Sequence, residues 1–200
     1  MSLLPAVTTR FRRGKLPHWE VKDGRYFVTV RLADSIPREA ALRLREVYTS
    51  LTDVEPRSEQ FAALQRRYFL SLEKYLDSGM GACLLREPEI AAIVVDELDR
   101  LGECQVEVAH HAVMPNHWHA LIVPSQDCVH SLGEIMKRLK GRSALRIRKA
   151  LGNSGAVWQR EWFDRWVRTD SEWERLVRYV RNNPVKAGLV ADWRDHPWTR

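Results

Sequence analysis

The sequence predicts an α+β protein in which helices pack on an antiparallel sheet. Segments with strand and helix patterns alternate along the 200 residues, which favours a mixed plait over an all-α or all-β fold. Two central strands, at 106–111 and 117–123, are joined by a short connection around Met114-Pro115-Asn116. So short a connection makes a hairpin and cannot make the crossover that a parallel sheet requires.

Each predicted element follows from a local pattern of side chains. Strands are expected where aromatic and β-branched residues gather or alternate with polar ones, and helices where apolar residues recur with a period near 3.6. Gly141 is expected to interrupt one long helix, and Pro184 to end the last one. The expected strands are 26–32, 106–111, 117–123, 157–159 and 162–169. One expected helix begins at Pro37, and four others cover 58–76, 88–101, 131–151 and 172–183.

We expect residues 1–200 to form one domain, because a chain with 44% hydrophobic residues can bury a core of its own. The helices between about 37 and 81 are interpreted as an insertion after the first strand. No apolar run approaches the roughly 20 residues of a membrane helix. Three scattered cysteines and an N-terminus without the pattern of an export signal favour a cytoplasmic location.

Positive charge is concentrated after residue 130. The chain has a net charge of +6, and residues 131–200 hold 16 Lys and Arg against 8 Asp and Glu. The run from 137 to 149 suits a polyanion such as DNA. A solvated helix face is the alternative, although such faces usually interleave both signs. The candidate DNA-binding residues are Lys137, Arg138, Lys140, Arg142, Arg146, Arg178, Arg181 and, as a base-stacking ring, Trp166.

The densest group of candidate chemical residues is the run MPNHWH. His117 and His119 are two residues apart, so on a strand they point to one face while Trp118 points to the other. Two neutral imidazoles suit a divalent metal. A pair of partly buried histidines beside a turn is the alternative, and the spacing alone does not choose between them.

A second group lies near the end of the last helix, in the run RYVRNNP. At roughly 100° per residue, Tyr179 lies about 110° from the centre of the apolar face, so it is not plain core. Asn183, four residues on, shares the face of Tyr179, and a phenol and a carboxamide could converge there. The alternative is a rim tyrosine with Asn183 as a C-terminal cap.

Together the two groups contain the parts of a metal-assisted phosphoryl transfer. A metal held by His117, His119 and the amide oxygen of Asn183 would polarise a phosphate. Tyr179 would then attack phosphorus and form a covalent phosphotyrosine.

The two runs resemble the HUH single-tyrosine transposases. MPNHWHALIVP is similar to their His-hydrophobic-His motif, with Trp118 where a smaller aliphatic residue is commoner. The run WQREWFDRWVRTDSEWERLVRYVRNNPVKAGLV resembles the C-terminal half of the REP-associated branch, and RYVRNNPVKAGLV matches its pattern of Tyr, four residues to Asn-Pro, then Ala-Gly-Leu. The likeness covers roughly residues 26–190.

The resemblance implies a ferredoxin-like plait, a Mg or Mn ion at His117 and His119 with Asn183 as third ligand, and Tyr179 as nucleophile. It implies cleavage of single-stranded DNA beside an imperfect palindromic hairpin, leaving a 5′-phosphotyrosine and a free 3′-OH, by a monomer or a homodimer. The alternative is a domesticated, non-catalytic protein that binds hairpin nucleic acid. The four intact site residues favour the enzyme, because a pure binding protein does not need all of them.

Overall fold

The computed structural model describes residues 8–13, 17–21, 23–52, 54–55 and 58–200. Within these ranges the main sheet is antiparallel and has the strand order β4-β5-β3-β6. Its strands are β3 (Arg25–Arg31), β4 (Val106–Met114), β5 (His117–Pro124) and β6 (Phe163–Val167). The helices are α1 (Arg38–Thr52), α2 (Glu59–Leu76), α3 (Pro88–Asp99), α4 (Leu132–Leu151) and α5 (Asp170–Lys186).

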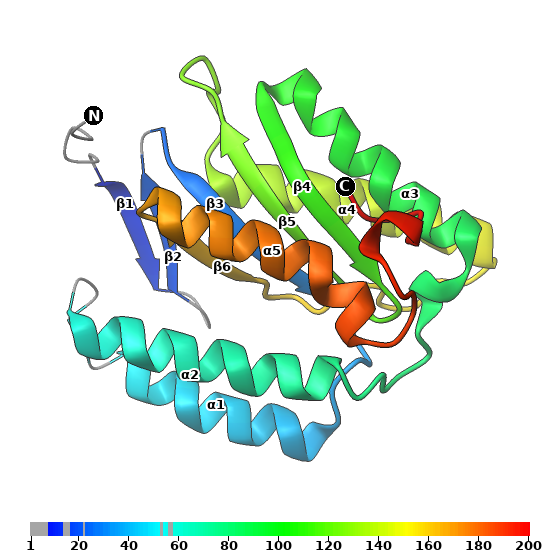
Figure 1. Ribbon diagram of the computed structural model, residues 1–200, viewed down its shortest axis with the longest axis horizontal. Helices are drawn as coiled ribbons and strands as arrows, with labels where there is room; N and C mark the ends of the chain where they lie inside the picture. The colour runs from blue at the N-terminus through cyan, green and yellow to red at the C-terminus, as the bar shows by residue number, and fades with distance from the viewer. Residues whose placement is uncertain (1–7, 14–16, 22, 53, 56–57) are drawn as a thin grey trace.

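The connections between these strands give the expected ferredoxin-like plait. The chain runs β3, α3, β4, β5, α4, β6, so each of the two crossover helices joins strands that are not neighbours in the sheet. The β4–β5 hairpin supplies the antiparallel centre, as the short connection predicts. Helices α1 and α2 come between β3 and α3, in the region interpreted as an insertion, and both lie to one side of the plait (Figure 1).

The sheet carries a separate apolar cluster on each face. One cluster packs Val28 and Val30 of β3 against α3 and α4. The other packs Phe27 of β3 against Val180 of α5 and against α1 and α2. Figure 1 shows α5 crossing the near face and α4 running behind the sheet. Alternate residues of one strand therefore pack in different clusters, one on each face of the sheet, as the two-residue period of a strand requires.

Several predicted boundaries are wrong. Helix α4 continues through Gly141, around which there is open space; a glycine in a helix costs only about 1 kcal/mol, which packing of the long helix offsets. Helix α5 likewise continues past Pro184 to Lys186, because a proline in the last turn removes few hydrogen bonds. The expected strand at 157–159 is reduced to an isolated bridge between Trp158 and Leu32.

A second sheet lies outside the predicted elements. Strands β1 (Thr8–Arg13) and β2 (Pro17–Val21) form an antiparallel pair. From β2, His18 binds the buried carboxylate of Asp164 in β6, and its ring stacks on Trp162. The contact connects this N-terminal pair to the edge of the main sheet. Every described helix is too short or too polar to cross a lipid bilayer.

Replacing Trp118 with alanine is expected to lower the free energy of unfolding by about 3 to 5 kcal/mol. The side chain is 1% exposed in the cluster beneath α3 and α4, so its removal leaves a large cavity. Urea unfolding checks this, with Trp118→Phe as the control that restores part of the loss. Wild-type stability in the alanine variant would contradict the placement of this ring in the core.

Candidate metal and nucleophile site

The site begins with the register of β5 against β3. His119 pairs with Thr29, His117 pairs with Arg31, and Trp118 pairs with Val30. Paired residues of neighbouring strands share a face. Both histidines therefore lie on the α5 side of the sheet, whereas Trp118 lies in the cluster on the other side. The opposite directions expected for the histidines and Trp118 are confirmed.

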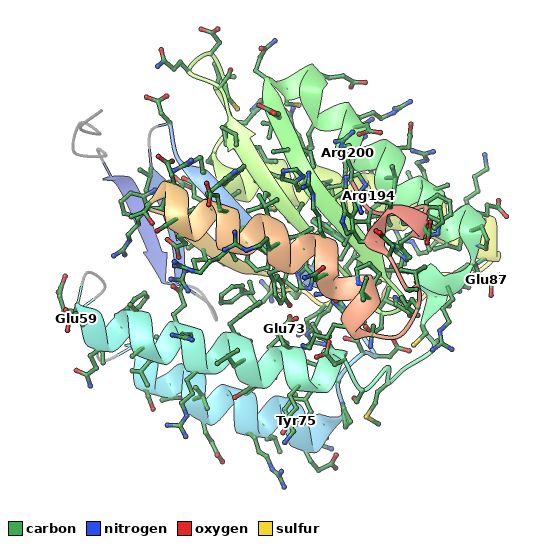
Figure 2. All side chains as sticks on the ribbon, viewed as in Figure 1. Glu59, Glu73, Tyr75, Glu87, Arg194 and Arg200 are labelled. Carbon is green, nitrogen blue, oxygen red and sulfur yellow. The ribbon has the colours of Figure 1, made fainter. Side chains whose placement is uncertain are left out.

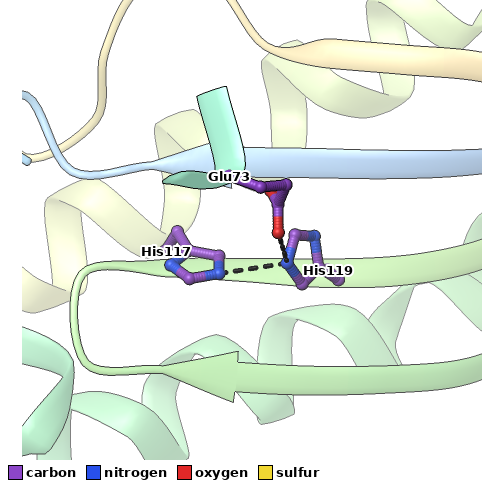
Figure 3. Close-up of side chains that lie close together, drawn as sticks. All are labelled: Glu73, His117 and His119. Atoms are coloured by element: carbon purple, nitrogen blue, oxygen red, sulfur yellow. Dashed lines mark hydrogen bonds and ion pairs between the residues drawn. The ribbon is translucent and has the colours of Figure 1, made fainter. Parts of the chain in front are cut away.

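The two imidazoles point toward one another in a buried position. Their Nε2 atoms are 3.0 Å apart, and His117 and His119 are 1% and 0% exposed. Figure 3 shows both rings converging with the carboxylate of Glu73, whose Oε2 is 3.5 Å from His119 Nε2. A metal-ligand atom from each of these three residues lies within 4.8 Å of the other two. The cluster thus offers two nitrogens and an oxygen to one point.

Hydrogen bonds behind the rings fix the state of His117. The Asn116 side-chain nitrogen is 3.2 Å from the carbonyl oxygens of Leu76 and Met80, so it donates to both. The amide oxygen of Asn116 therefore faces His117 Nδ1, at 2.7 Å, and accepts a proton from it. Because a neutral imidazole carries one N–H, His117 Nε2 is left with a free lone pair for a metal.

Thr29 forms the corresponding hydrogen bond with Nδ1 of His119. Its Oγ1 is 2.8 Å from His119 Nδ1. A hydroxyl both donates and accepts, so Thr29 can serve either tautomer of this ring. If the proton is on His119 Nε2, it is shared with His117 Nε2, 3.0 Å away. With the proton on Nδ1 instead, both Nε2 atoms would face the cluster as lone pairs.

Tyr179 reaches the same point from α5. Its ring packs on Phe27 and Phe69, with centroid distances of 5.8 and 5.7 Å, while its hydroxyl points past them. The hydroxyl donates a hydrogen bond to Glu73 Oε2 and lies 3.4 Å from His119 Nε2. The prediction that Tyr179 is more than core is therefore supported by its contacts. The ring is packed, and the phenol oxygen touches the cluster.

Glu73 is the site residue that sequence reasoning missed. It projects from the side of α2 that faces α5 (Figure 2) and is 3% exposed. A signal was present, because Glu73 lies one turn from Phe69 and from Leu76 on the apolar stripe of an amphipathic helix. A carboxylate in such a stripe is unusual. Without the tertiary contact, however, nothing connects it to residues some 45 positions later.

Asn183 lies one turn beyond Tyr179, as the spacing predicts. It is 1% exposed, and neither atom of its amide group has a hydrogen-bond partner among the described residues. Because α5 continues to Lys186, Asn183 is not the helix cap of the alternative interpretation. A buried amide without hydrogen-bond partners lowers the stability of the fold. Such a group is typical of a site that binds a ligand. Its role as third metal ligand stays a prediction.

Burial keeps the two imidazoles neutral. Loss of solvation, together with the neighbouring His119, lowers the pKa of His117 to about 3. Loss of solvation also lowers the pKa of His119 to about 3. Burial raises the pKa of Glu73 to about 7, partly offset by His117. The approach of Glu73 to His119 is therefore not an ion pair at neutral pH, and both rings keep lone pairs that a cation can use.

These pKa values predict that the metal-free protein loses stability in acid. Below about pH 6.5 His117 and His119 bind protons in the unfolded chain but not in the folded protein. The free energy of unfolding therefore decreases as the pH is lowered. Glu73 acts in the opposite direction between about pH 7 and 4.5 but offsets only one proton. Urea unfolding from pH 7 to pH 5 with EDTA should show the decrease, and His119→Gln should reduce its slope by about one proton. Equal slopes would show that His119 is protonated in the folded state.

The basic residues of α4 do not lie beside this cluster. Helix α4 packs on the face occupied by Trp118, and α3 supplies acids to it. Arg142 binds Glu97 at 2.9 Å, and Arg146 binds both Glu97 and Asp96. Neutralisation by a neighbouring helix is invisible in a count along the sequence. A DNA role for this surface stays a prediction.

The other three α4 candidates have different surroundings. Lys140 Nζ donates to the carbonyl oxygens of Gln159 and Arg160 at 2.8 and 2.6 Å, and burial lowers its pKa to about 8. Arg138 contacts the His130 ring at 3.0 Å. Lys137 is exposed on the helix. Lys137 and Arg138 are thus exposed α4 candidates that no acidic side chain pairs with among the described residues.

The two α5 arginines are nearer to the nucleophile. Arg178 precedes Tyr179 and is 66% exposed, with only a 4.0 Å contact to Glu174. The Arg181 guanidinium lies 4.7 Å from the centre of the Trp193 ring. Trp166 of β6 pairs with Tyr26 of β3, so it belongs to the Trp118 face, and the Arg168 guanidinium lies over its ring. Arg178 is therefore the predicted DNA contact best placed beside Tyr179.

Residues 97–183 match the family model described as "Transposase IS200 like". The matched region runs from α3 to α5 and includes His117, His119, Tyr179 and Asn183. The match covers less than half of the 200-residue chain, so it shows what this segment is similar to. The expected resemblance to transposases is thereby confirmed for this segment. Within the matched segment, the fold brings the histidine strand and the tyrosine helix into contact.

The individual proteins that resemble this chain are distant from it. An uncharacterised protein of Haemophilus influenzae is 25% identical over 103 residues, which is 40% of this chain and 56% of its own length. A solved REP-associated tyrosine transposase bound to a REP hairpin is 17% identical, with a TM-score of 0.49, and the match covers 96% of this chain and 81% of that one. A candidate transposase from Deinococcus radiodurans is 14% identical, with a TM-score of 0.35 and coverage of 86% and 96%. The similarity to transposases therefore depends on the family model for residues 97–183.

Proposed function

We propose that this protein is a metal-dependent single-stranded DNA endonuclease and strand transferase of the REP-associated type. The observation that carries the proposal is the position of the Tyr179 hydroxyl, 3.4 Å from His119 Nε2, within a segment of a transposase family. A phenol with that neighbour is placed to attack a phosphate held at the histidine pair.

The residues present fit a divalent cation. His117 and His119 are neutral and present converging Nε2 atoms, and Asn183 has a buried amide oxygen without a partner among the described residues. A mixed nitrogen and oxygen set suits Mn, and with more oxygen ligands Mg. When bound there, the ion would act as a Lewis acid on the scissile phosphate.

The chain's own groups account for the remaining chemistry. Tyr179 Oη attacks phosphorus, the bond from phosphorus to the 3′ oxygen breaks, and the leaving oxygen takes up a proton from water, which gives a 5′-phosphotyrosine and a free 3′-OH. The phenolic proton passes to Glu73 Oε2, to which the hydroxyl already donates. Phe27 and Phe69 hold the ring so that the oxygen stays at the cluster. Arg178, exposed beside Tyr179, is available to a backbone phosphate.

A labelled hairpin with single-stranded flanks, incubated with the protein and Mn²⁺, tests this proposal. The expected result is a protein–DNA adduct that survives denaturation, appears only with metal, and is accompanied by a fragment with a free 3′-OH. Hairpin binding without an adduct would contradict the enzyme and support the non-catalytic hairpin-binding alternative. Absence of both binding and adduct on palindromes from the flanks of the gene would contradict either form of the proposal.

A further inference from the structure

The helical insertion, residues 37–81, reaches the histidine pair at two points. From α2, Glu73 lies 3.5 Å from His119 and accepts the hydrogen bond of Tyr179. At the end of the insertion, the carbonyl oxygens of Leu76 and Met80 hold the Asn116 amide, which in turn fixes His117. A segment outside the strand-and-crossover order of the plait therefore supplies contacts to both rings.

Among the described residues, no lysine or arginine forms an ion pair with Glu73. Its side chain is buried, and among the described residues its only charged-type contact is with the His119 ring. Lys186 forms its ion pair with Asp77, at 2.6 Å, and its charge lowers the pKa of Glu73 without direct contact. One Glu73 oxygen accepts from Tyr179, and the other has no hydrogen-bond partner within the described ranges. Burial of a carboxylate costs several kcal/mol unless a cation or donors compensate.

We propose that Glu73 is a ligand of the divalent metal, so that the insertion forms part of the metal centre. This inference rests on the proposed function, which places a metal at His117 and His119. The ligand atoms of the three residues already lie within 4.8 Å of one another. A bound cation would compensate the buried carboxylate, and the carboxylate would complete a set of two imidazoles and one oxygen acid. Because Glu73 also holds Tyr179, it links the position of the nucleophile to that of the metal.

Mn²⁺ binding to the full-length, DNA-free protein tests the assignment without any use of activity. Isothermal titration, or loss of the EPR signal of free Mn²⁺, gives the affinity. We expect Glu73→Gln to weaken Mn²⁺ binding at least about 10-fold, because the variant keeps the shape of the side chain but loses the charge that attracts the ion. Wild-type affinity in Glu73→Gln would overturn the proposal.

Glu97→Gln is the matched control. Glu97 is also a buried carboxylate, at 2% exposure, but it lies on the other face of the sheet and binds Arg142 and Arg146. It should bind Mn²⁺ as the wild type does. Glu73→Asp retains the charge and should bind more weakly than the wild type but more tightly than Glu73→Gln, so it reports on the ligand even if the glutamine variant does not fold. An aspartate variant with undiminished affinity would count against the assignment.

The outcomes separate this inference from the proposed function. If Glu73→Gln binds Mn²⁺ normally while the wild type forms the DNA adduct, the Glu73 assignment fails and the proposed function stands. If Mn²⁺ binding depends on Glu73 but the wild type forms no adduct, the ligand is supported and the proposed reaction fails. A wild-type protein that binds no Mn²⁺ overturns the Glu73 assignment and removes the metal from the proposed function.

Discussion

Replacing Tyr179 with phenylalanine is expected to lower the yield of the DNA adduct at least about 1000-fold, because only the attacking oxygen is removed. The phenylalanine ring can keep its contacts with Phe27 and Phe69, so the fold and the affinity for the hairpin should change little. Denaturing gel electrophoresis of the labelled hairpin measures the adduct, and a filter-binding titration measures the affinity.

Tyr75→Phe is the control for loss of a phenol. Tyr75 lies on α2, two residues from Glu73, and contributes its ring to the cluster that also contains Leu72 and Leu76. This variant should form the adduct as the wild type does. An adduct of normal yield in Tyr179→Phe would show that another group attacks the phosphate and would remove Tyr179 from the reaction.

Replacing His119 with alanine is expected to abolish detectable cleavage and to weaken Mn²⁺ binding at least about 100-fold. The reason is geometric, since His119 contacts the other three groups of the cluster: His117 at 3.0 Å, Glu73 at 3.5 Å and Tyr179 at 3.4 Å. Even residues that only orient a ligand cost 10- to 100-fold in metal affinity when removed, as a rough guide, so loss of a ligand should cost at least as much.

His111→Ala is the matched control for His119→Ala. His111 is likewise buried, at 3% exposure, but it pairs with Ala120 and so lies on the other side of the sheet from His119. Its loss should leave both Mn²⁺ binding and adduct formation unchanged. Thermal unfolding of the two variants separates loss of fold from loss of the site. Cleavage at the wild-type rate by a folded His119→Ala protein would refute its role as ligand.

Much of the fold was predictable because its signals are local. The short Met114-Pro115-Asn116 connection excludes a parallel crossover, and the β4–β5 pairing follows from it. Predicted helix boundaries were wrong where the helix propensity of a single residue competes with tertiary packing. Gly141 and Pro184 disfavour a helix by amounts that the tertiary contacts of α4 and α5 exceed. The β1–β2 pair had no clear alternation to reveal it.

The α4 charges show how a sequence count can mislead. The run from 137 to 149 has no acid, which favoured an open polyanion site. In the structure two of its arginines, Arg142 and Arg146, bind Glu97, and Arg146 also binds Asp96; both acids lie some 50 positions earlier on α3. Pairing of charges between helices depends on how the helices pack. The composition of one segment therefore does not predict it. The contact of Glu73 with the histidine pair was not predicted for the same reason.

The sequence by itself determined which residues could do chemistry: a His-x-His pair on one face of a strand, and a tyrosine with an asparagine one turn later. It could do so because strand and helix periods fix direction locally. Only the tertiary structure decided which groups meet. Pairing of β5 with β3 places Thr29 behind His119, and packing of α2 and α5 brings Glu73 to Tyr179. These contacts join segments far apart in the chain, so they exist only once the core has formed.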